Sequence, residues 1–389
     1  MIFKEQKKCY LVLNSTFELA KNWLLNSGIF ISEQNDENFG GVYSFYDEEK
    51  KSFSFLYPEI TGYYSSTMRF LYTHEKNDDF LQRAKASCDW LIKLFDSYGG
   101  IIQGITPDKK PMKFVYSFDT AICAKGILDF YEISKDEKYL IFAKKLNRWI
   151  IDTALNSDGT INPLYDLESK QFISSKDVWY KQYGCLHIKT IMSLLSEYKI
   201  TNDELLLSNA LTIANNVKNF QNKDGSIRLH SKDKVINLHT LCYALEGLLY
   251  CYSVTKEDTF LNSCKNALKW CDQQIKNDGS IDLWFNSKYH SKSSYPIAQI
   301  IRIKILLSKL TNSFEPEYLS NLKFLNSLQS TNSNLHSNGG FYEEFYKSVF
   351  NWKKRSRVNS WASMFALQAF FWHENLSKID FNREIELLY

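Results

Sequence analysis

Two acidic residues occupy matching places in the sequence. Glu59 and Asp119 lie 18 and 19 residues after the second glycine of two Gly-Gly pairs. Pro58 suits the first turn of a helix, and the helix dipole favours a carboxylate beside it. Two carboxyl groups at one level on neighbouring helices suit general acid and base catalysis, because proximity and different burial separate their pKa values. We predict that they form a catalytic pair, and Gly62, a poor helix former, favours this function. Alternatively, each acid only stabilises its own helix.

Histidines supply two further candidates. His239 lies in the first turn of a predicted helix and is a third acid or base candidate. Trp179, Tyr183 and His187 are spaced by four residues, which places them along one face of a helix. Cys185 and His187 could suggest zinc, but a C-x-H pair on a helix does not point both ligands the same way, and no second cluster joins it. We predict no metal site, and His187 is either a core residue or a sugar contact.

Aromatic residues are abundant. They make up 15% of the chain, with 24 Tyr and 9 Trp. Tyr and Trp combine an apolar face with a hydrogen-bonding tip, which suits the binding of sugar rings, although large aromatic side chains could equally fill a wide core. The predicted substrate-binding residues are Tyr57, Tyr63, Tyr116, Trp179, Tyr183, His187, Asn237, Tyr295, Gln299, Arg357, Asn359 and Trp361.

Four basic residues gather just before the last apolar segment. They are Lys353, Lys354, Arg355 and Arg357. Such a cluster could bind a carboxylate, sulfate or phosphate of an anionic substrate, and Arg357 lies nearest the predicted rim of the site. The alternative is a solvated basic loop.

Six glycine turns organise the chain. Their glycines fall at 41, 100, 159, 225, 279 and 340, a drifting period of roughly 60 residues. Apolar helical segments precede each turn, and a second apolar segment, such as 116–131 or 238–252, follows it. Glycine permits the positive φ that ends a helix, so the repeat is helix, turn, helix. Six such hairpins could stack as an open solenoid or close into a ring. The second helix is apolar nearly all round, which favours closure into an all-α (α/α)6 barrel, with residues 1–389 as a single domain.

Composition excludes several classes of protein. The net charge is +3 and the charges are interspersed, so we expect no nucleic-acid partner. Residues 1–28 contain no secretory signal, and no stretch is long and apolar enough to enter a membrane. The eight cysteines, Cys9 among them, lie mostly in apolar segments and lack the spacing of a disulfide framework. We therefore expect reduced core thiols in a cytoplasmic protein. We also expect no cofactor. The oligomeric state stays open.

The six helical hairpins resemble the six-hairpin glycosidase-like superfamily over nearly the whole chain. Residues 117–121, Ser-Phe-Asp-Thr-Ala, are similar to the second acidic motif of unsaturated glucuronyl hydrolases, whereas that family has Asp in a different local sequence at the place of Glu59. Residues 57–63 and 359–368 resemble helical-toroid proteins of bacterial surface-polysaccharide clusters. Residues 295–299 give a weaker resemblance to glucuronyl C5-epimerases. The resemblance implies work on a sugar in a polysaccharide pathway.

Several functions are compatible with these residues. The first is a carbohydrate-active enzyme resembling a glycoside hydrolase, in which Asp119 and Glu59 carry out acid and base catalysis. The alternatives are a uronate C5-epimerase or polysaccharide lyase, and a non-catalytic glycan-binding protein. A terpene-cyclase-like toroid is suggested by Gln221 before Asp224, but no Asp-rich motif for magnesium is present. A lanthionine-cyclase-like enzyme would need a zinc triad that Cys185 and His187 do not supply.

Overall fold

The computed structural model describes residues 16–175, 178–311, 317–349 and 351–389. By its contacts the chain forms two compact units, so the predicted single domain stays a prediction. Unit 1 combines Met1–Phe30, Tyr43–Ser54 and Trp270–Glu386, and unit 2 combines Ile31–Val42, Phe55–Lys269 and Leu387–Tyr389. Cys9 lies outside the described residues, and the seven described cysteines are buried.

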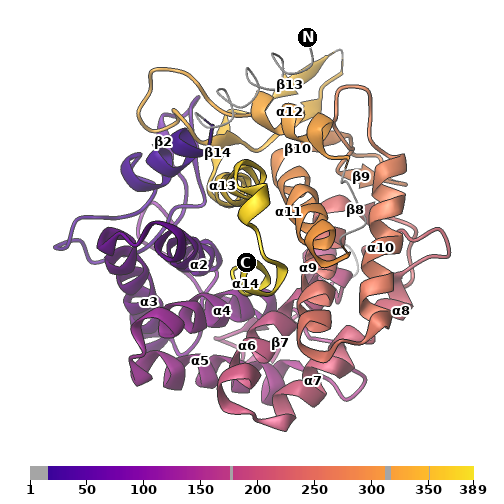
Figure 1. The fold of residues 1–389 in the computed structure, drawn as a ribbon. Coiled ribbons are helices and arrows are strands. Elements are labelled where there is room, and N and C mark those ends of the chain that lie inside the picture. The colour runs from indigo at the N-terminus through magenta and orange to yellow at the C-terminus, as the bar shows by residue number, and fades with distance from the viewer. Residues whose placement is uncertain (1–15, 176–177, 312–316, 350) are drawn as a thin grey trace. The chain divides into compact units, whose positions relative to one another are not determined.

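Unit 2 is built from helical hairpins. Its inner helices α2 (Pro58–Glu75), α4 (Ser117–Ser134), α6 (Ile191–Thr201) and α9 (Leu238–Thr255) pack against one another in chain order. Helices α3 (Asp78–Tyr98), α5 (Glu137–Trp149) and α7 (Glu204–Ala214) each cover the inner helix before them (Figure 1). The predicted inner segments 116–131 and 238–252 are therefore confirmed, as is the helix, turn, helix repeat.

The remaining elements of unit 2 are short. They are β3 (Gly104–Ile105), β4 (Pro111–Met112), β5 (Phe114–Tyr116), η1 (Ile150–Ala154), β6 (Leu164–Asp166), β7 (Gln171–Phe172), η2 (Trp179–Lys181), η3 (Cys185–Thr190), α8 (Val217–Phe220) and β8 (Ile236–Asn237). Helix α10 (Asp258–Gln273) begins in unit 2 and ends in unit 1. Strand β5 leads directly into α4, and β6 and β7 complete an antiparallel sheet with it.

Unit 1 contains a first helix, whose described part covers residues 16–26, and two longer later helices. Helix α11 (Ser294–Thr311) packs against α12 (Leu319–Ser327) and α13 (Ser360–Glu374). The other elements are β1 (Phe45–Asp47), β2 (Ser52–Phe53), β9 (Trp284–Phe285), β10 (Ser291–Ser293), β11 (Phe341–Tyr342), β12 (Glu344–Lys347), β13 (Trp352–Lys354), β14 (Arg357–Asn359), η4 (Leu376–Lys378) and α14 (Phe381–Glu386). Apart from β9, these strands form two sheets, ordered β11-β14-β1-β2 and β10-β12-β13.

The glycine turns fit closely against the next outer helix. Gly225 has φ +95°, and a Cβ placed there would lie 2.3 Å from the Asn266 carbonyl oxygen. Gly279 has φ +80°, and its Cβ would lie 2.0 Å from the Ser320 carbonyl oxygen. Any larger residue would meet both backbone strain and a clash. The repeated glycine therefore sets the spacing between successive hairpins as well as ending a helix.

The inner helices of unit 2 end in the same way. A residue in the left-handed conformation stops each one, and in the first three hairpins the very next side chain caps the following helix by accepting a backbone N–H. The stopping residues are Lys76, Lys135, Asn202 and Lys256, and the caps are Asn77, Asp136 and Asp203. Each chain reversal at this end of a hairpin thus depends only on local side chains.

Residues 179–187 do not form the single helical face predicted from their spacing. The chain makes a short turn of helix at Trp179–Lys181, becomes extended at Gly184, and starts a new helical segment at Cys185. A Cβ at Gly184 would lie 2.8 Å from the Leu229 carbonyl oxygen. Close backbone packing therefore interrupts the helix, and the four-residue spacing is not a helical one.

Gly62 has a packing role, contrary to its interpretation as a sign of function. A Cβ at Gly62 would lie 2.9 Å from the Ile122 carbonyl oxygen, and one at Gly126 would lie 2.3 Å from the Gly62 carbonyl oxygen. Helices α2 and α4 thus approach each other through two glycines.

Replacing Gly126 with alanine tests this close approach. The clash with backbone outweighs the helix propensity of alanine, so we expect the free energy of unfolding to fall by about 1–3 kcal/mol. Urea denaturation measures it. Gly99→Asn is the control, because Gly99 has φ +80° with open space around it and asparagine tolerates this conformation. Equal losses in the two variants would argue against close helix packing.

Within the described residues, no helix combines the length and apolarity needed to cross a membrane.

Candidate functional site

Glu59 and Asp119 lie close together in unit 2, and Tyr57 lies beside both. The Tyr57 side chain is near enough to lower the pKa of each carboxyl group, and the charge of Glu59 raises the pKa of Asp119. Tyr57 precedes α2, Glu59 is in its first turn, and Asp119 is in the first turn of α4. The predicted pairing of the two acids is present in the structure.

Burial alters the charge of both acids. Glu59 is 8% exposed and Asp119 is 4% exposed, and Asp119 Oδ2 has no hydrogen-bond partner. Burial raises the pKa of Glu59 to about 7, against the lowering effects of Tyr57 and the Lys189 ammonium. Burial and the charge of Glu59 raise the pKa of Asp119 well above its usual range. Glu59 therefore titrates near neutral pH, and Asp119 keeps its proton to a higher pH than an ordinary aspartate does.

These pKa values favour chemistry over a purely structural role. A first-turn acid stabilises its helix through negative charge near the positive end of the dipole. A protonated Asp119 supplies little of that charge, and its burial has a free-energy cost without such a gain. Strongly perturbed carboxyl groups that share a partner are typical of acid and base catalysis.

A buried lysine lies below the acids. Lys189 Nζ forms an ion pair with Glu246 Oε2 at 2.6 Å, with both side chains at most 1% exposed. The same Nζ lies 4.9 Å and 4.5 Å from the ring centroids of Tyr63 and Tyr243. Tyr63 is 1% exposed, so it supports this layer from the core. The sequence prediction missed this ion pair. Its signal was a lysine and a glutamate, Lys189 and Glu246, in two apolar segments about one repeat apart.

His239 lies at the start of α9, as predicted. Its ring is half-buried, and its centroid lies 4.1 Å from that of Tyr243. Tyr243 also contacts Phe118, the neighbour of Asp119, at 4.9 Å. Ring contacts therefore run from His239 through Tyr243 to Phe118, the residue before Asp119.

Exposed aromatic rings flank the acids. Tyr116 and Tyr180 have ring centroids 6.2 Å apart, and Trp179 lies 5.6 Å from Tyr180. Trp179 is 38% exposed and Tyr180 is 43% exposed. Burial, the charge of Asp119 and that of Tyr180 raise the pKa of Tyr116, which places this hydroxyl in the electrostatic field of the acid. The group offers apolar faces of the kind on which sugar rings stack.

Three other predicted binding residues have structural contacts. His187 is 2% exposed, burial lowers its pKa to about 4, and its ring Nδ1 contacts the backbone of Gly184. Tyr183 stacks on His187 with centroids 5.4 Å apart. The Asn237 side chain caps α9 by accepting the Thr240 N–H at 3.1 Å. His187 is thus a neutral core histidine, the first of the two predicted alternatives.

Unit 1 holds the remaining candidates. Tyr295 and Trp361 have ring centroids 5.9 Å apart, and Asn359 caps α13 by accepting the Ala362 N–H at 3.0 Å. Gln299 is fully buried in α11. Glu343, which the sequence prediction missed, lies 3.6 Å from Arg357 Nη1 through its Oε2 atom.

The basic run is mostly engaged by other side chains. Arg355 Nη2 contacts Glu344 at 2.7 Å, and the Arg357 guanidinium lies over the Phe45 ring at 4.6 Å. Lys354 Nζ lies 3.7 Å from the centroid of Tyr342, and Lys353 is exposed. In the described parts of the chain, no group of three or more His, Cys, Asp or Glu residues is placed to hold a metal ion.

The sequence matches no protein-family model and no curated protein. Solved structures nevertheless share its fold. Cellobiose 2-epimerase from Bacillus thermoamylovorans has 13% identity and a TM-score of 0.73, over 96% of this chain and 100% of that one. D-mannose isomerase has 13% identity and a TM-score of 0.75, over 94% and 97%. An unsaturated glucuronyl hydrolase from a Bacillus species has 12% identity and a TM-score of 0.65, over 91% and 97%.

These similarities confirm the predicted fold class, an all-α (α/α)6 barrel, and the six-hairpin glycosidase-like fold. The three neighbours are sugar-processing enzymes by their names, and they include an epimerase, an isomerase and a hydrolase.

Proposed function

We propose that this chain is a carbohydrate-active enzyme in which Asp119 and Glu59 transfer protons at one sugar. The pair of buried carboxyl groups in the first turns of the packed helices α2 and α4 is the observation that carries the proposal. The exposed rings of Trp179 and Tyr180, which reach Asp119 through Tyr116, support a sugar as the substrate. The similar folds of sugar-processing enzymes add support at the level of fold only.

Hydrolysis of a glycosidic bond is the first candidate reaction. Asp119 gives its proton to the glycosidic oxygen, which takes the electron pair of the breaking carbon–oxygen bond. Glu59, when ionised, takes a proton from the water whose oxygen bonds to the anomeric carbon. One water is consumed, and return of a proton from Glu59 to Asp119 restores the starting state. The packing of α2 against α4, with an acid in the first turn of each, places the two carboxyl groups near one bond.

Epimerisation or isomerisation is the second candidate. His239 favours it, because an imidazole near the acids supplies a titratable group of a different type. One group would remove a proton from a sugar carbon, and another would return a proton to the resulting enolate.

Product analysis separates these reactions. The purified protein is incubated in deuterated water with neutral and uronate oligosaccharides. Smaller products that have gained water indicate hydrolysis, whereas deuterium bound to carbon in a sugar of unchanged composition indicates epimerisation. Smaller products whose masses add up to that of the substrate, with no water gained, indicate elimination. Binding without turnover of any sugar would contradict the enzyme and leave a glycan-binding protein.

Glu59→Gln tests the role of the titrating acid. Since Glu59 acts as a base only when ionised, wild-type turnover should rise with pH through about 7. The apparent pKa of this rise reflects Glu59 and Asp119 together, because the two acids interact. In Glu59→Gln the rise should vanish, and turnover should fall by about 10²-fold or more. The matched control is Asp78→Asn, which alters an exposed first-turn acid of α3. An unchanged pH dependence in Glu59→Gln would argue against this role.

A further inference from the structure

Three buried polar atoms of unit 1 come from neighbouring positions and have no hydrogen-bond partner. They are Glu343 Oε2, Asn359 Nδ2 and Trp361 Nε1. Asn359 is fully buried. Each buried polar group without a partner costs about 1–3 kcal/mol, so two such N–H donors, beside a Glu343 oxygen that has only ion pairs at 3.6 Å and 3.9 Å, call for an explanation. A ligand with hydroxyl groups could supply one acceptor to each N–H donor and one donor to the carboxylate.

Strand pairing brings these groups together. Phe341 pairs with Asn359 and Tyr342 with Val358, and the Glu343 N–H donates to the Arg357 carbonyl. Because side chains alternate along a strand, Glu343, Arg357 and Asn359 share one face of the β11–β14 ladder.

Tyr295 and Trp361 complete this group. Their rings lie 5.9 Å apart. Burial and the charges of Glu343 and Glu344 raise the pKa of Tyr295, which indicates its proximity to the acids. We name Tyr295, Glu343, Arg357, Asn359 and Trp361 the Glu343 cluster.

The charges near the Glu343 cluster nearly balance. Arg357 faces Glu343 at 3.6 Å, and Arg355 contacts Glu344 at 2.7 Å and Glu343 at 3.9 Å. Burial and the charge of Glu344 raise the pKa of Glu343 to about 7, against the two arginines. An anionic ligand would meet the repulsion of these carboxylates as well as the attraction of the arginines. A neutral ligand avoids that repulsion.

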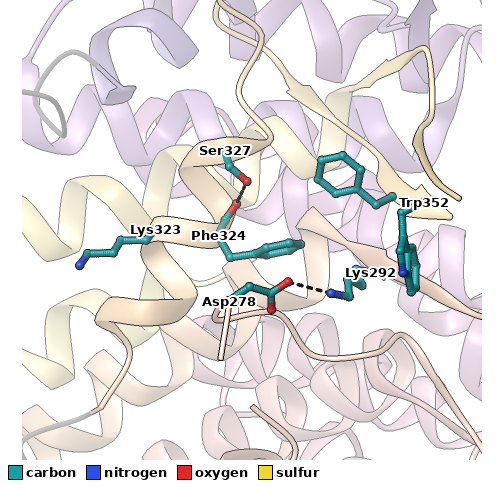
Figure 2. Close-up of a pocket in the computed structure, with 7 residues that line it drawn as sticks. Asp278, Lys292, Lys323, Phe324, Ser327 and Trp352 are labelled. Carbon is teal, nitrogen blue, oxygen red and sulfur yellow. Dashed lines mark hydrogen bonds and ion pairs between the residues drawn. The ribbon is translucent and has the colours of Figure 1, made fainter. Parts of the chain in front are cut away.

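A second site in unit 1 serves as a comparison. Figure 2 shows a pocket of about 460 Å³ lined by Asp278, Lys292, Lys323, Phe324, Ser327, Phe345 and Trp352. Three of its four polar side chains have partners, since Lys292 contacts Asp278 at 2.7 Å and Ser327 donates to the Phe324 carbonyl at 2.7 Å (Figure 2). Phe345 faces this pocket, so its strand neighbour Glu344 points to the opposite face of β12. The pocket therefore requires no ligand.

We propose that the Glu343 cluster is a binding site for an uncharged sugar. Glu343 accepts a hydroxyl hydrogen, and Asn359 and Trp361 donate to hydroxyl oxygens. This inference rests on the proposed function, which supplies the expectation that the ligand is a sugar. It names a neutral sugar, whereas the basic run at residues 353–357 suggested an anionic one.

Binding measurements in the Asp119→Asn background test the proposal without turnover. The probes are neutral disaccharides, cellobiose and mannobiose among them, each with its counterpart oxidised to a uronate. We expect neutral probes to bind at least about 10-fold more tightly than their uronates, in line with the like-charge repulsion. Glu343→Gln and Trp361→Phe should each weaken neutral binding by about 5- to 30-fold, because the first replaces a charged acceptor oxygen with an amide and the second removes an N–H donor. Trp361→Phe keeps an aromatic ring and removes only the N–H donor and part of the ring area.

Trp352→Ala is the matched control, because it changes an aromatic residue of the comparison pocket and should leave binding unchanged. Thermal unfolding verifies that each variant is folded. Tighter binding of uronates, no binding of any neutral probe at millimolar concentration, or unchanged affinity in both cluster variants would overturn the proposal. If sugar binding depends on Glu343 but the wild type turns over no sugar, the proposed enzyme function is contradicted and the proposed binding site stands. Turnover that depends on Asp119, with binding insensitive to Glu343, would contradict the cluster alone.

Discussion

Asp119→Asn should lower turnover by about 10²–10⁴-fold, the usual contribution of a general acid. Asparagine has the shape of the protonated carboxyl that the folded protein holds, but it has no acidic proton to give. The measurement is the initial rate on whichever oligosaccharide the wild type converts, with the fold verified by circular dichroism. Full activity in the variant would contradict the role of Asp119.

The stability of Asp119→Asn supplies an independent readout. The folded protein binds the Asp119 proton more tightly than the unfolded chain does, since the folded pKa is raised. The resulting stability is present below the unfolded pKa and is lost as pH rises toward the folded pKa. Asparagine does not titrate, so the difference in melting temperature between variant and wild type should become more positive from acidic to neutral pH. A difference that is independent of pH would show that the carboxyl has an ordinary pKa.

Asp129→Asn should destabilise the protein by about 3–5 kcal/mol, because it leaves two buried cations without their counter-ion. Asp129 is 2% exposed, contacts Arg69, and lies 2.6 Å from Lys125 Nζ. Lys125 is 3% exposed. Chemical denaturation in urea measures the loss.

Asp89→Asn is the matched control. Asp89 also contacts two cations, Lys85 at 2.6 Å and Lys138 at 2.7 Å, but all three side chains are at least 35% exposed. Surface pairs of this kind contribute about 0–1 kcal/mol each. If Asp129→Asn costs no more than Asp89→Asn, water must reach the Asp129 group, and the burial argument fails.

The repeat explains why much of the fold and the acid pair could be predicted. A glycine period of roughly 60 residues fixes where each inner helix begins, so Glu59 and Asp119 can be placed at one level by counting along the chain. Helix type and bounds follow from long apolar segments in the same way. These features depend on spacing along the chain, which the sequence displays directly.

Other parts of the site depend on contacts between distant segments. The helix expected across Trp179 and His187 is interrupted because Gly184 packs on the backbone of Leu229, 45 residues away in the chain. Glu343 becomes notable only when β11 and β14 pair. Its neighbour Glu344 pairs with Arg355, one of the residues that the sequence suggested for binding an anion.

The local chain reversals at the ends of α2, α4 and α6 have a consequence for engineering. The left-handed residue and the adjacent cap make each reversal self-sufficient, while Glu59, Asp119 and His239 lie at the opposite ends of their helices. The reversals are thus encoded apart from the helix starts that carry the proposed catalytic residues. We predict that exchanging the loops at those starts, with the glycine turns kept, alters sugar binding while the hairpins still fold.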